Sequence, residues 1–393
     1  MATGIIADSW LKKIVAGLLI ICGSSLLFIA SFMAAGALPV QDLAQYWSAA
    51  HLVRLNPYSY QLVAHFQHSN GIFVDPPLVL KNPPWAIPFI LPLGVFSYRA
   101  AFAAWTLFTI SVLMIGTRAV WLELNAPASS LVPLLFPFLF GPAIVQLLLG
   151  QCTILVLLGI VAFLIAAEKG RDWTAGAALV LVLGKPHVAL LFLLVAALWI
   201  VRQRRWRILA SGCLALIATS LFVEFLNPHI WSQFVARMTL VAHEGEAYPN
   251  LGGMLYLVSR IHSLALIPQL LGFAWVAFYW RKHRNNWNWW EQGTMVLLCS
   301  VFCSYYSYPY DEILALPALL FAIAHTSGRA FWTAFLITEL GYVVYVSNGA
   351  GYFGFGYMFL SWTASGWLVA CILAQRSRLY GADRHEPLRS DVN

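Results

Sequence analysis

The sequence predicts an all-α polytopic membrane protein, and three observations carry this prediction. Apolar residues make up 61% of the 393-residue chain, charged residues make up only 10%, and the apolar residues gather in long runs. Such a composition excludes an ordinary soluble surface. Lipid offers backbone groups no hydrogen-bond partners, and no alternating ten-residue strand pattern recurs, so the spans are predicted to be helices.

The positions of the basic residues predict the orientation. Lys12 and Lys13 precede the first apolar run, and a basic cluster at 202–207 follows a later one, which places both in the cytoplasm by the positive-inside rule. The net charge of +7 is accounted for by this bias, so no nucleic-acid partner is needed. About twelve spans satisfy the arrangement: 14–35, 83–97, 100–121, 152–167, 173–184, 188–201, 207–226, 263–280, 290–306, 311–326, 330–346 and 352–374.

This arrangement predicts one transmembrane domain over 1–380 and a cytoplasmic tail over 381–393, in a multi-pass protein of the plasma (inner) membrane. The apolar stretch 131–149 is predicted to be broken or re-entrant, because Pro133, Pro137 and Pro142 interrupt it. Two long connections, 39–84 and 227–262, then lie on the outer face. The first of them is expected to contain a short helix.

Neither a metal site nor a disulfide is predicted. The six cysteines lie in or beside apolar segments. The segment around His243 and Glu244 lacks the second histidine of the zinc-helix signature. A glycine-rich phosphate loop is also missing, so no nucleotide or other cofactor is expected.

Several motifs in a fixed order carry a family resemblance. After the first apolar run come DLAQYWSAAHLVRLNPY, NPPWAIPFILPLGVF, GQCTILVLL and KPHVALLFLL, the last ahead of a basic segment. This order resembles the polyprenol-phosphate-mannose-dependent mannosyltransferases of the glycosyltransferase-C superfamily, glycosyltransferase family 87. The resemblance extends over most of the chain and implies a glycosyltransferase-C-type bundle whose 1–380 domain is catalytic.

The resemblance implies an integral-membrane enzyme that moves a sugar, mannose above all, from a polyprenyl-phosphate donor to an acceptor hydroxyl, with inversion. The acceptor is a lipid, a glycan or a protein. The family's aspartate in the first outer loop maps onto Asp42, which would act as general base, because an alcohol attacks well only when a carboxylate takes its proton. Donor-phosphate binding is expected from cationic side chains, since the leaving group is an anion: Lys185, His187, Arg54 and Arg260. Substrate contacts are expected from six further residues: Gln45, Tyr46, Gln151, Tyr308, Tyr310 and Asp311.

Each of the main candidates also has a purely structural explanation. Asp42 with Gln45 could form a helix-capping box. Lys185 could extend to the lipid headgroups. Gln151 could satisfy carbonyls freed by the broken segment, and 305–312 could be an aromatic belt with a helix cap.

Two other classes of function remain open on the sequence. A flippase or transporter of a lipid carrier would place facing charges at mid-depth in two related halves, and no convincing internal repeat is present. A non-catalytic partner in envelope assembly would show dispersed aromatic residues without a pocket of converging charges.

Overall fold

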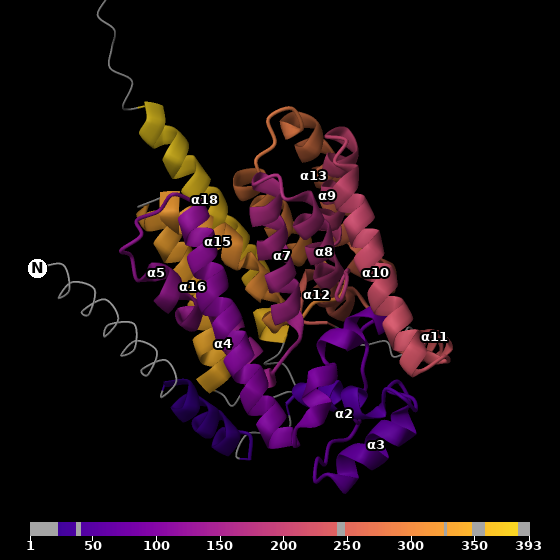
Figure 1. Cartoon of the computed structure of the whole chain (residues 1–393). Coiled ribbons are helices and arrows are strands. Elements are labelled where there is room, and N and C mark those ends of the chain that lie inside the picture. Colours follow the sequence, from indigo (N-terminus) through magenta and orange to yellow (C-terminus); the bar gives the residue numbers. More distant parts are fainter. Residues whose placement is uncertain (1–22, 37–40, 242–247, 326–327, 348–357, 384–393) are drawn as a thin grey trace, which may run out of the picture.

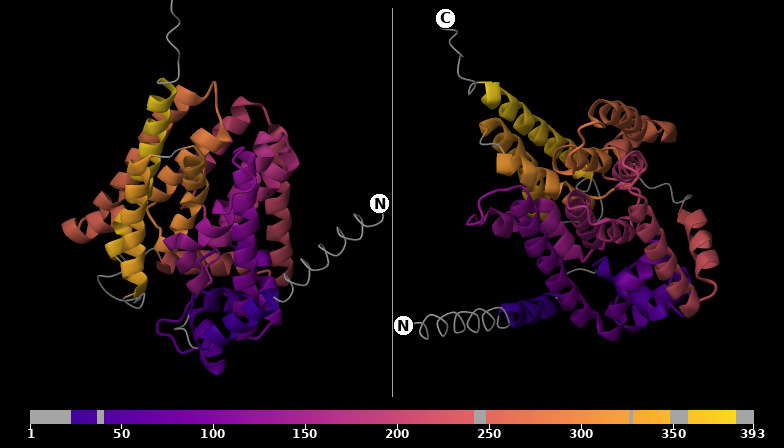
Figure 2. Two further views of the ribbon diagram at one scale, coloured as in Figure 1. Left: turned by 90° about the vertical axis from the view of Figure 1, so that its left-hand side faces the viewer. Right: turned by 45° about the horizontal axis from the view of Figure 1, so that its top comes forward.

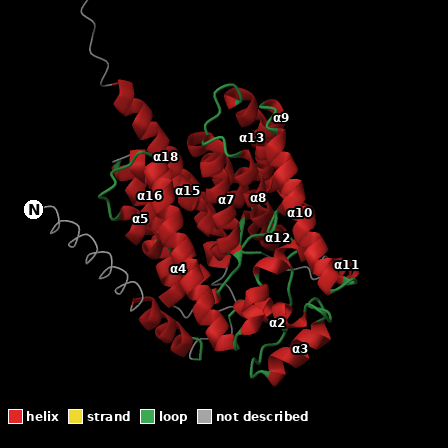
Figure 3. Ribbon diagram, in the orientation of Figure 1, coloured by secondary structure: helices red, strands yellow, loops and turns green. Residues whose placement is uncertain are grey.

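The computed structural model describes residues 23–36, 41–241, 248–325, 328–347 and 358–383. Within these ranges every regular element is a helix and no strand occurs (Figure 3). Part of the first predicted span (14–22), part of the last (352–357), His243 with Glu244, and most of the tail (384–393) lie outside the described residues.

The first described helix is Gly23–Ala34, within the first predicted span. The other helices of the first half are α2 (Leu43–Leu52), α3 (Tyr60–Ser69), η1 (Pro84–Phe89), η2 (Leu91–Val95), α4 (Tyr98–Glu123), α5 (Val132–Leu135), η3 (Phe136–Leu139), α6 (Gly141–Leu149), α7 (Thr153–Glu168), α8 (Asp172–Val182) and α9 (Leu190–Arg202). Those of the second half are α10 (Trp206–Leu226), α11 (Ile230–Val241), α12 (Leu251–Ser259), η4 (His262–Leu266), α13 (Ile267–His283), η5 (Trp289–Gly293), α14 (Thr294–Phe302), η6 (Pro309–Ala315), α15 (Leu316–His325), α16 (Arg329–Ser347), η7 (Phe359–Trp362) and α18 (Thr363–Asp383).

Three of the described helices are long and apolar enough to cross a membrane: α4, α10 and the continuous segment His262–His283. The pair Val132–Leu139 and Gly141–Leu149 is bent by 69° and adds a fourth candidate if it counts as one span. The bend lies within 131–149, where the prolines predict an interruption. These helices support a helical membrane protein, while the total of twelve spans stays a prediction.

The predicted span 83–97 does not form one long helix. It folds into the two short 3₁₀ helices η1 and η2, with Pro84 and Pro88 in the first and Pro92 in the second. Proline removes a backbone donor and clashes with the preceding turn, which shortens the helices. The two helices have 6 and 5 residues, so at about 2 Å per residue neither of them alone crosses a hydrocarbon layer of about 30 Å.

Helices α2 and α3 cap one end of the helical bundle (Figures 1 and 2). Leu43, Ala44 and Ala49 of α2 are fully buried, so this short helix is embedded against the bundle. Its partner is η2, where an added Cβ on Gly94 would lie 3.2 Å from the Cβ of Ala50. The 39–84 segment therefore contains the predicted short helix and holds its first turn at the bundle end.

Helix α6 meets α16 at a glycine. A Cβ added to Gly141 would lie 2.2 Å from Cγ of Tyr342, so only glycine allows this approach. Glu339 strengthens the contact, because its Oε2 accepts a hydrogen bond of 2.9 Å from the Gly141 N–H at the start of α6. The broken segment is thus anchored on α16 at its bend.

We expect Gly141→Ala to lower the free energy of unfolding by about 1–3 kcal/mol, as overpacking of a filled interior does. Gly116→Ala in α4 is the matched control, since an added Cβ there meets nothing within 4 Å. Helix propensity favours alanine by up to about 1 kcal/mol at that position. Denaturant unfolding of both variants in detergent checks this, and equal stability of the two would contradict it.

Candidate functional site

Asp42 is the first member of a buried polar cluster. It stands at the N-cap position of α2 but makes no side-chain cap hydrogen bond to the described residues. Its Oδ2 instead accepts a hydrogen bond of 2.5 Å from Nε2 of Gln151, more than one hundred residues away. The capping-box explanation therefore does not describe this aspartate, whose carboxylate faces the bundle.

Gln151 reaches Asp42 because of the glycine before it. Gly150 ends α6 in the left-handed conformation, with φ of +65°, and an added Cβ would lie 2.9 Å from Cβ of Leu43. Glycine adopts this conformation without strain and allows the close approach to α2. The Gln151 carboxamide is then held on both sides, since its Oε1 accepts from the Tyr46 hydroxyl at 2.6 Å and from Nζ of Lys185 at 3.3 Å.

Lys185 lies in the turn between α8 and α9 and points into the protein. Its Nζ donates to Thr153 Oγ1 and to Asp311 Oδ1, each at 2.9 Å, and lies 4.7 Å from the centroid of the Tyr310 ring. The residue is only 7% exposed. It therefore does not extend toward headgroups, and its charge is compensated by the ion pair with Asp311.

Asp311 comes from the start of η6 and closes the cluster. Its Oδ1 also accepts from the Thr153 hydroxyl at 2.6 Å, and its Oδ2 accepts from the Tyr308 N–H at 3.1 Å. The carboxylate thus caps η6 and pairs with Lys185 at once. The sequence analysis predicted Asp311 only as a substrate contact and did not indicate this ion pair.

The cluster contains two carboxylates and one ammonium group, so Asp42 lacks a full counter-charge. Burial raises the pKa of Asp42 above its ordinary value of 3.8, while the hydrogen bond from Gln151 and the charges of Lys185 and Lys81 act in the opposite direction. The charge of Asp311 adds to the rise. A carboxyl group with a raised pKa is a stronger base once ionised.

Aromatic rings border the ion pair. Tyr308 and Tyr310 stack at 5.3 Å with an interplanar angle of 14°, and His187 meets the edge of Tyr306 at 4.9 Å. The Nε2 atom of His187 is buried and has no hydrogen-bond partner among the described residues. The predicted residues Tyr308, Tyr310 and His187 thus lie around the cluster.

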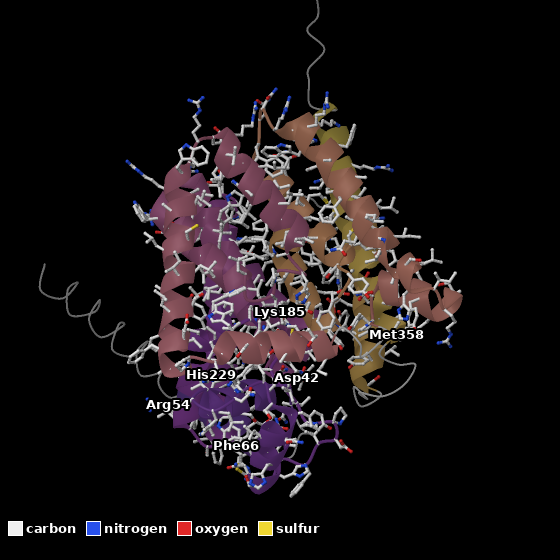
Figure 4. All side chains as sticks on the ribbon, turned by 90° about the vertical axis from the view of Figure 1, so that its right-hand side faces the viewer. Asp42, Arg54, Phe66, Lys185, His229 and Met358 are labelled. Atoms are coloured by element: carbon white, nitrogen blue, oxygen red, sulfur yellow. The ribbon has the colours of Figure 1, made fainter. Side chains whose placement is uncertain are left out.

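Three predicted residues lie apart from the cluster. Arg54 and Arg260 are exposed, and Gln45 is half-buried. No hydrogen bond or ion pair joins any of the three side chains to the cluster within the described part of the chain. Figure 4 shows the difference for the labelled residues: Lys185 lies where the bundle meets the α2 and α3 cap, near Asp42, whereas Arg54 lies farther out in the cap.

Two residues that the sequence did not single out are part of the arrangement. Thr153, which directly follows the Gly-Gln-Cys motif, joins Lys185 to Asp311. Asn82 of the Asn-Pro-Pro motif donates to the Gly184 carbonyl at 3.0 Å and so holds the turn that carries Lys185. Their place within the quoted motifs was the available signal, but neither residue carries a charge.

Comparison with known families decides the class of protein to which this chain belongs. The model of glycosyltransferase family 87 matches residues 81–304, more than half of the chain. The chain belongs to this family. The resemblance predicted from the motif order is therefore confirmed. A comparison with curated proteins found no match of significance.

Membership of family 87 makes the chain a glycosyltransferase and a membrane protein. The assignment favours the enzyme over the flippase and the envelope-assembly partner that the sequence left open. The matched range includes Gln151 and Lys185, whereas Asp42 and Asp311 lie on either side of it. The four-residue cluster thus extends from the matched region to both flanks.

Proposed function

We propose that this family 87 glycosyltransferase moves a hexose, with mannose as the first choice, from a polyprenyl-phosphate donor to an acceptor hydroxyl, with inversion at the anomeric carbon. The observation that carries the proposal is the carboxamide bridge from Asp42 through Gln151 to Lys185. It joins a group able to take a proton to a group able to hold a phosphate. Both are needed for this reaction.

In the proposed reaction the acceptor oxygen attacks the anomeric carbon from the face opposite the phosphate. The new C–O bond forms as the bond between the anomeric carbon and the phosphate oxygen breaks. The acceptor proton passes to the carboxylate of Asp42, and the electron pair of the broken bond leaves with the polyprenyl phosphate. The hydrogen bond from Gln151 fixes the direction of the Asp42 carboxylate for this transfer.

The leaving phosphate gains negative charge, and Lys185 is the cation proposed to stabilise it. Its partner Asp311 holds the ammonium group in place, as a preorganised charge requires. We assign the unpartnered Nε2 of His187 to the same phosphate as a second donor. Arg54 and Arg260 stay predicted phosphate contacts without a link to this cluster.

An apolar pocket that could receive part of the donor lipid lies beside the cluster. This small, largely apolar pocket lies between η1, α7 and α8. Tyr46, Cys152 and Gly184 line it, and each is next to or part of the cluster. An isoprenoid segment matches this lining, so the pocket supports a polyprenyl donor rather than a nucleotide sugar.

We assign the sugar and acceptor contacts to the polar and aromatic groups around the ion pair. Tyr46 and Gln151 lie beside Asp42, and the stacked rings of Tyr308 and Tyr310 lie beside Asp311. Gln45 follows Asp42 by one turn and is a further candidate. The acceptor, whether lipid, glycan or protein, would meet Asp42 on the outer face of the plasma membrane.

The direct test is transfer by the purified protein in detergent from synthetic polyprenyl-phosphate mannose, glucose and a pentose, with nucleotide sugars in parallel. We expect product with the lipid-linked donors, mannose giving the highest kcat/KM, and an inverted linkage by NMR. Product from a nucleotide sugar alone would overturn the donor assignment. A preference for another lipid-linked sugar would overturn only the assignment of mannose as the transferred sugar.

The raised pKa of Asp42 predicts the acidic limb of the rate profile. A general base works only when ionised, so kcat/KM should fall as the pH drops through the pKa of Asp42. Because burial raises this pKa, the fall should be centred above pH 3.8, the ordinary value for aspartate. A pH–rate profile measures the midpoint, and a constant rate down to pH 3.8 would remove Asp42 from the role.

A further inference from the structure

The residue after Asp311 is buried for a different reason. Glu312 is 4% exposed, and within the described part of the chain its side-chain hydrogen bonds go to residues outside the cluster described above. Its Oε2 accepts from the Tyr342 hydroxyl at 2.9 Å and from Nε1 of Trp367 at 2.8 Å, and its Oε1 accepts from the Thr363 hydroxyl at 2.8 Å. One side chain of η6 thus holds three donors of α16 and α18.

The 3₁₀ geometry of η6 explains how neighbouring carboxylates serve different partners. With three residues per turn, successive side chains point about 120° apart. Asp311 therefore faces Lys185 on α8–α9, while Glu312 faces α16 and α18. Any rotation or shift of η6 around Glu312 would move Asp311 by a similar amount.

Tyr342 adds a second connection to the same element. Its hydroxyl also lies 3.1 Å from the Pro309 carbonyl, the first residue of η6. Its ring packs against Gly141, where α6 begins, and α6 leads to Gln151. The contacts of Glu312 and Tyr342 therefore join η6 to the helices that hold both ends of the cluster.

We infer that Glu312 is a positioning residue that holds Asp311, and through it Lys185, in the geometry that the reaction uses. The catalytic consequence rests on the proposed function, but the structural part does not. Glu312 is proposed to act as a hydrogen-bond acceptor for three buried donors, and its charge is not needed by the substrate. A shift of about 1 Å in a reacting group can cost about 10²-fold in rate.

This role predicts that Glu312→Gln keeps the position of η6 and that Glu312→Ala does not. A carboxamide oxygen can accept from Trp367 and Tyr342, while its NH₂ donates to Thr363. Thr363 tolerates this reversal because its hydroxyl also lies 2.6 Å from the Leu360 carbonyl, to which it can donate. Alanine leaves Nε1 of Trp367 without an acceptor, and the hydroxyls of Tyr342 and Thr363 keep only the Pro309 and Leu360 carbonyls, so the hold of α16 and α18 on η6 through Glu312 is lost and η6 should shift.

The first experiment needs no substrate. A small amine-acylating reagent is applied to the purified full-length protein, and mass spectrometry measures the modification rate of Lys185. We expect Asp311→Asn and Glu312→Ala to raise this rate several-fold, while Glu312→Gln and the exposed control Glu224→Ala match the unchanged protein. The inference is overturned if Lys185 is modified faster in Asp311→Asn but at the unchanged rate in Glu312→Ala. That result would leave the proposed function untouched.

The second experiment is a double-mutant cycle in the transfer assay. If Glu312 acts through Asp311, Glu312→Ala and Asp311→Asn should each lower kcat/KM by about 10²-fold, and the double variant should lose no more than the worse single. If the losses in kcat/KM of the two single variants multiply in the double variant, the two residues act independently and the inference is overturned.

Should Glu312→Ala fail to fold, Trp367→Phe replaces it in both experiments, since it removes one donor to Glu312 and keeps an aromatic ring. Trp367→Phe with unchanged Lys185 labelling and additive kinetics would also overturn it.

Discussion

Asp42→Asn should lower kcat by about 10²–10⁴-fold, the usual contribution of a positioned general base. Asparagine keeps the size of the side chain and an oxygen that can accept from Gln151, so the fold should be retained. What it loses is the ability to take the acceptor proton. The measurement is product formation from a polyprenyl-phosphate sugar under single-turnover conditions, where chemistry is separated from release of product.

Asp75→Asn is the matched control for this experiment. Asp75 is an exposed carboxylate in the same 39–84 segment, and it belongs to no part of the cluster. We expect this variant to keep the rate of the unchanged protein. If Asp42→Asn is folded, as judged by its thermal unfolding, and still turns over at the original rate, another group must be the base.

Lys185→Met should have the largest effect on stability, with a loss of about 3–5 kcal/mol. It removes the charge from a buried pair and leaves the fully buried Asp311 with only neutral donors. Lys169→Met is the control, because Lys169 pairs with Glu123 at an exposed position, where side-chain exposures are 43% and 22%. Such a surface pair contributes about 0–1 kcal/mol. Denaturant unfolding in detergent compares the two.

The double variant Lys185→Met with Asp311→Asn separates stability from catalysis. Removing both charges should restore much of the lost stability, because no unpaired charge stays buried. The rate of transfer should not recover, since the phosphate still lacks its cation. Recovery of turnover together with stability would show that the pair is structural, and Lys185 would lose its place in the proposed reaction.

The sequence alone already indicated the class of protein and its family. Composition predicted a helical membrane protein because lipid tolerates only backbones with internal partners, and the order of motifs predicted the family. Asp42, Gln151 and Lys185 were all named as candidates on this basis. The interruption at 131–149 was also indicated, since proline is tolerated in the first turn of a helix but breaks or kinks its interior.

Where the sequence went astray, local chemistry competed with hydropathy. The run 83–97 is apolar enough for a span, yet its prolines shorten it into two 3₁₀ helices. Glu312 was noted only as part of the 305–312 patch and Thr153 only as part of a quoted motif, because a buried acceptor and a buried hydroxyl look like ordinary helix residues until their partners are known. Arg54 and Arg260 were chosen for their charge; both are exposed, and they stay predicted phosphate contacts.

The sequence by itself determined which groups are present: a carboxylate at the head of a short helix, a glutamine after a glycine, and a lysine within an apolar run. Only the tertiary structure decided which of them meet. Lys185 and Asp311 are 126 residues apart, and Gln151 and Asp42 are 109 apart. No local propensity reports such separations, because each contact exists only once α2, α6, α8 and η6 have packed around a shared buried space, where an unpaired charge is costly.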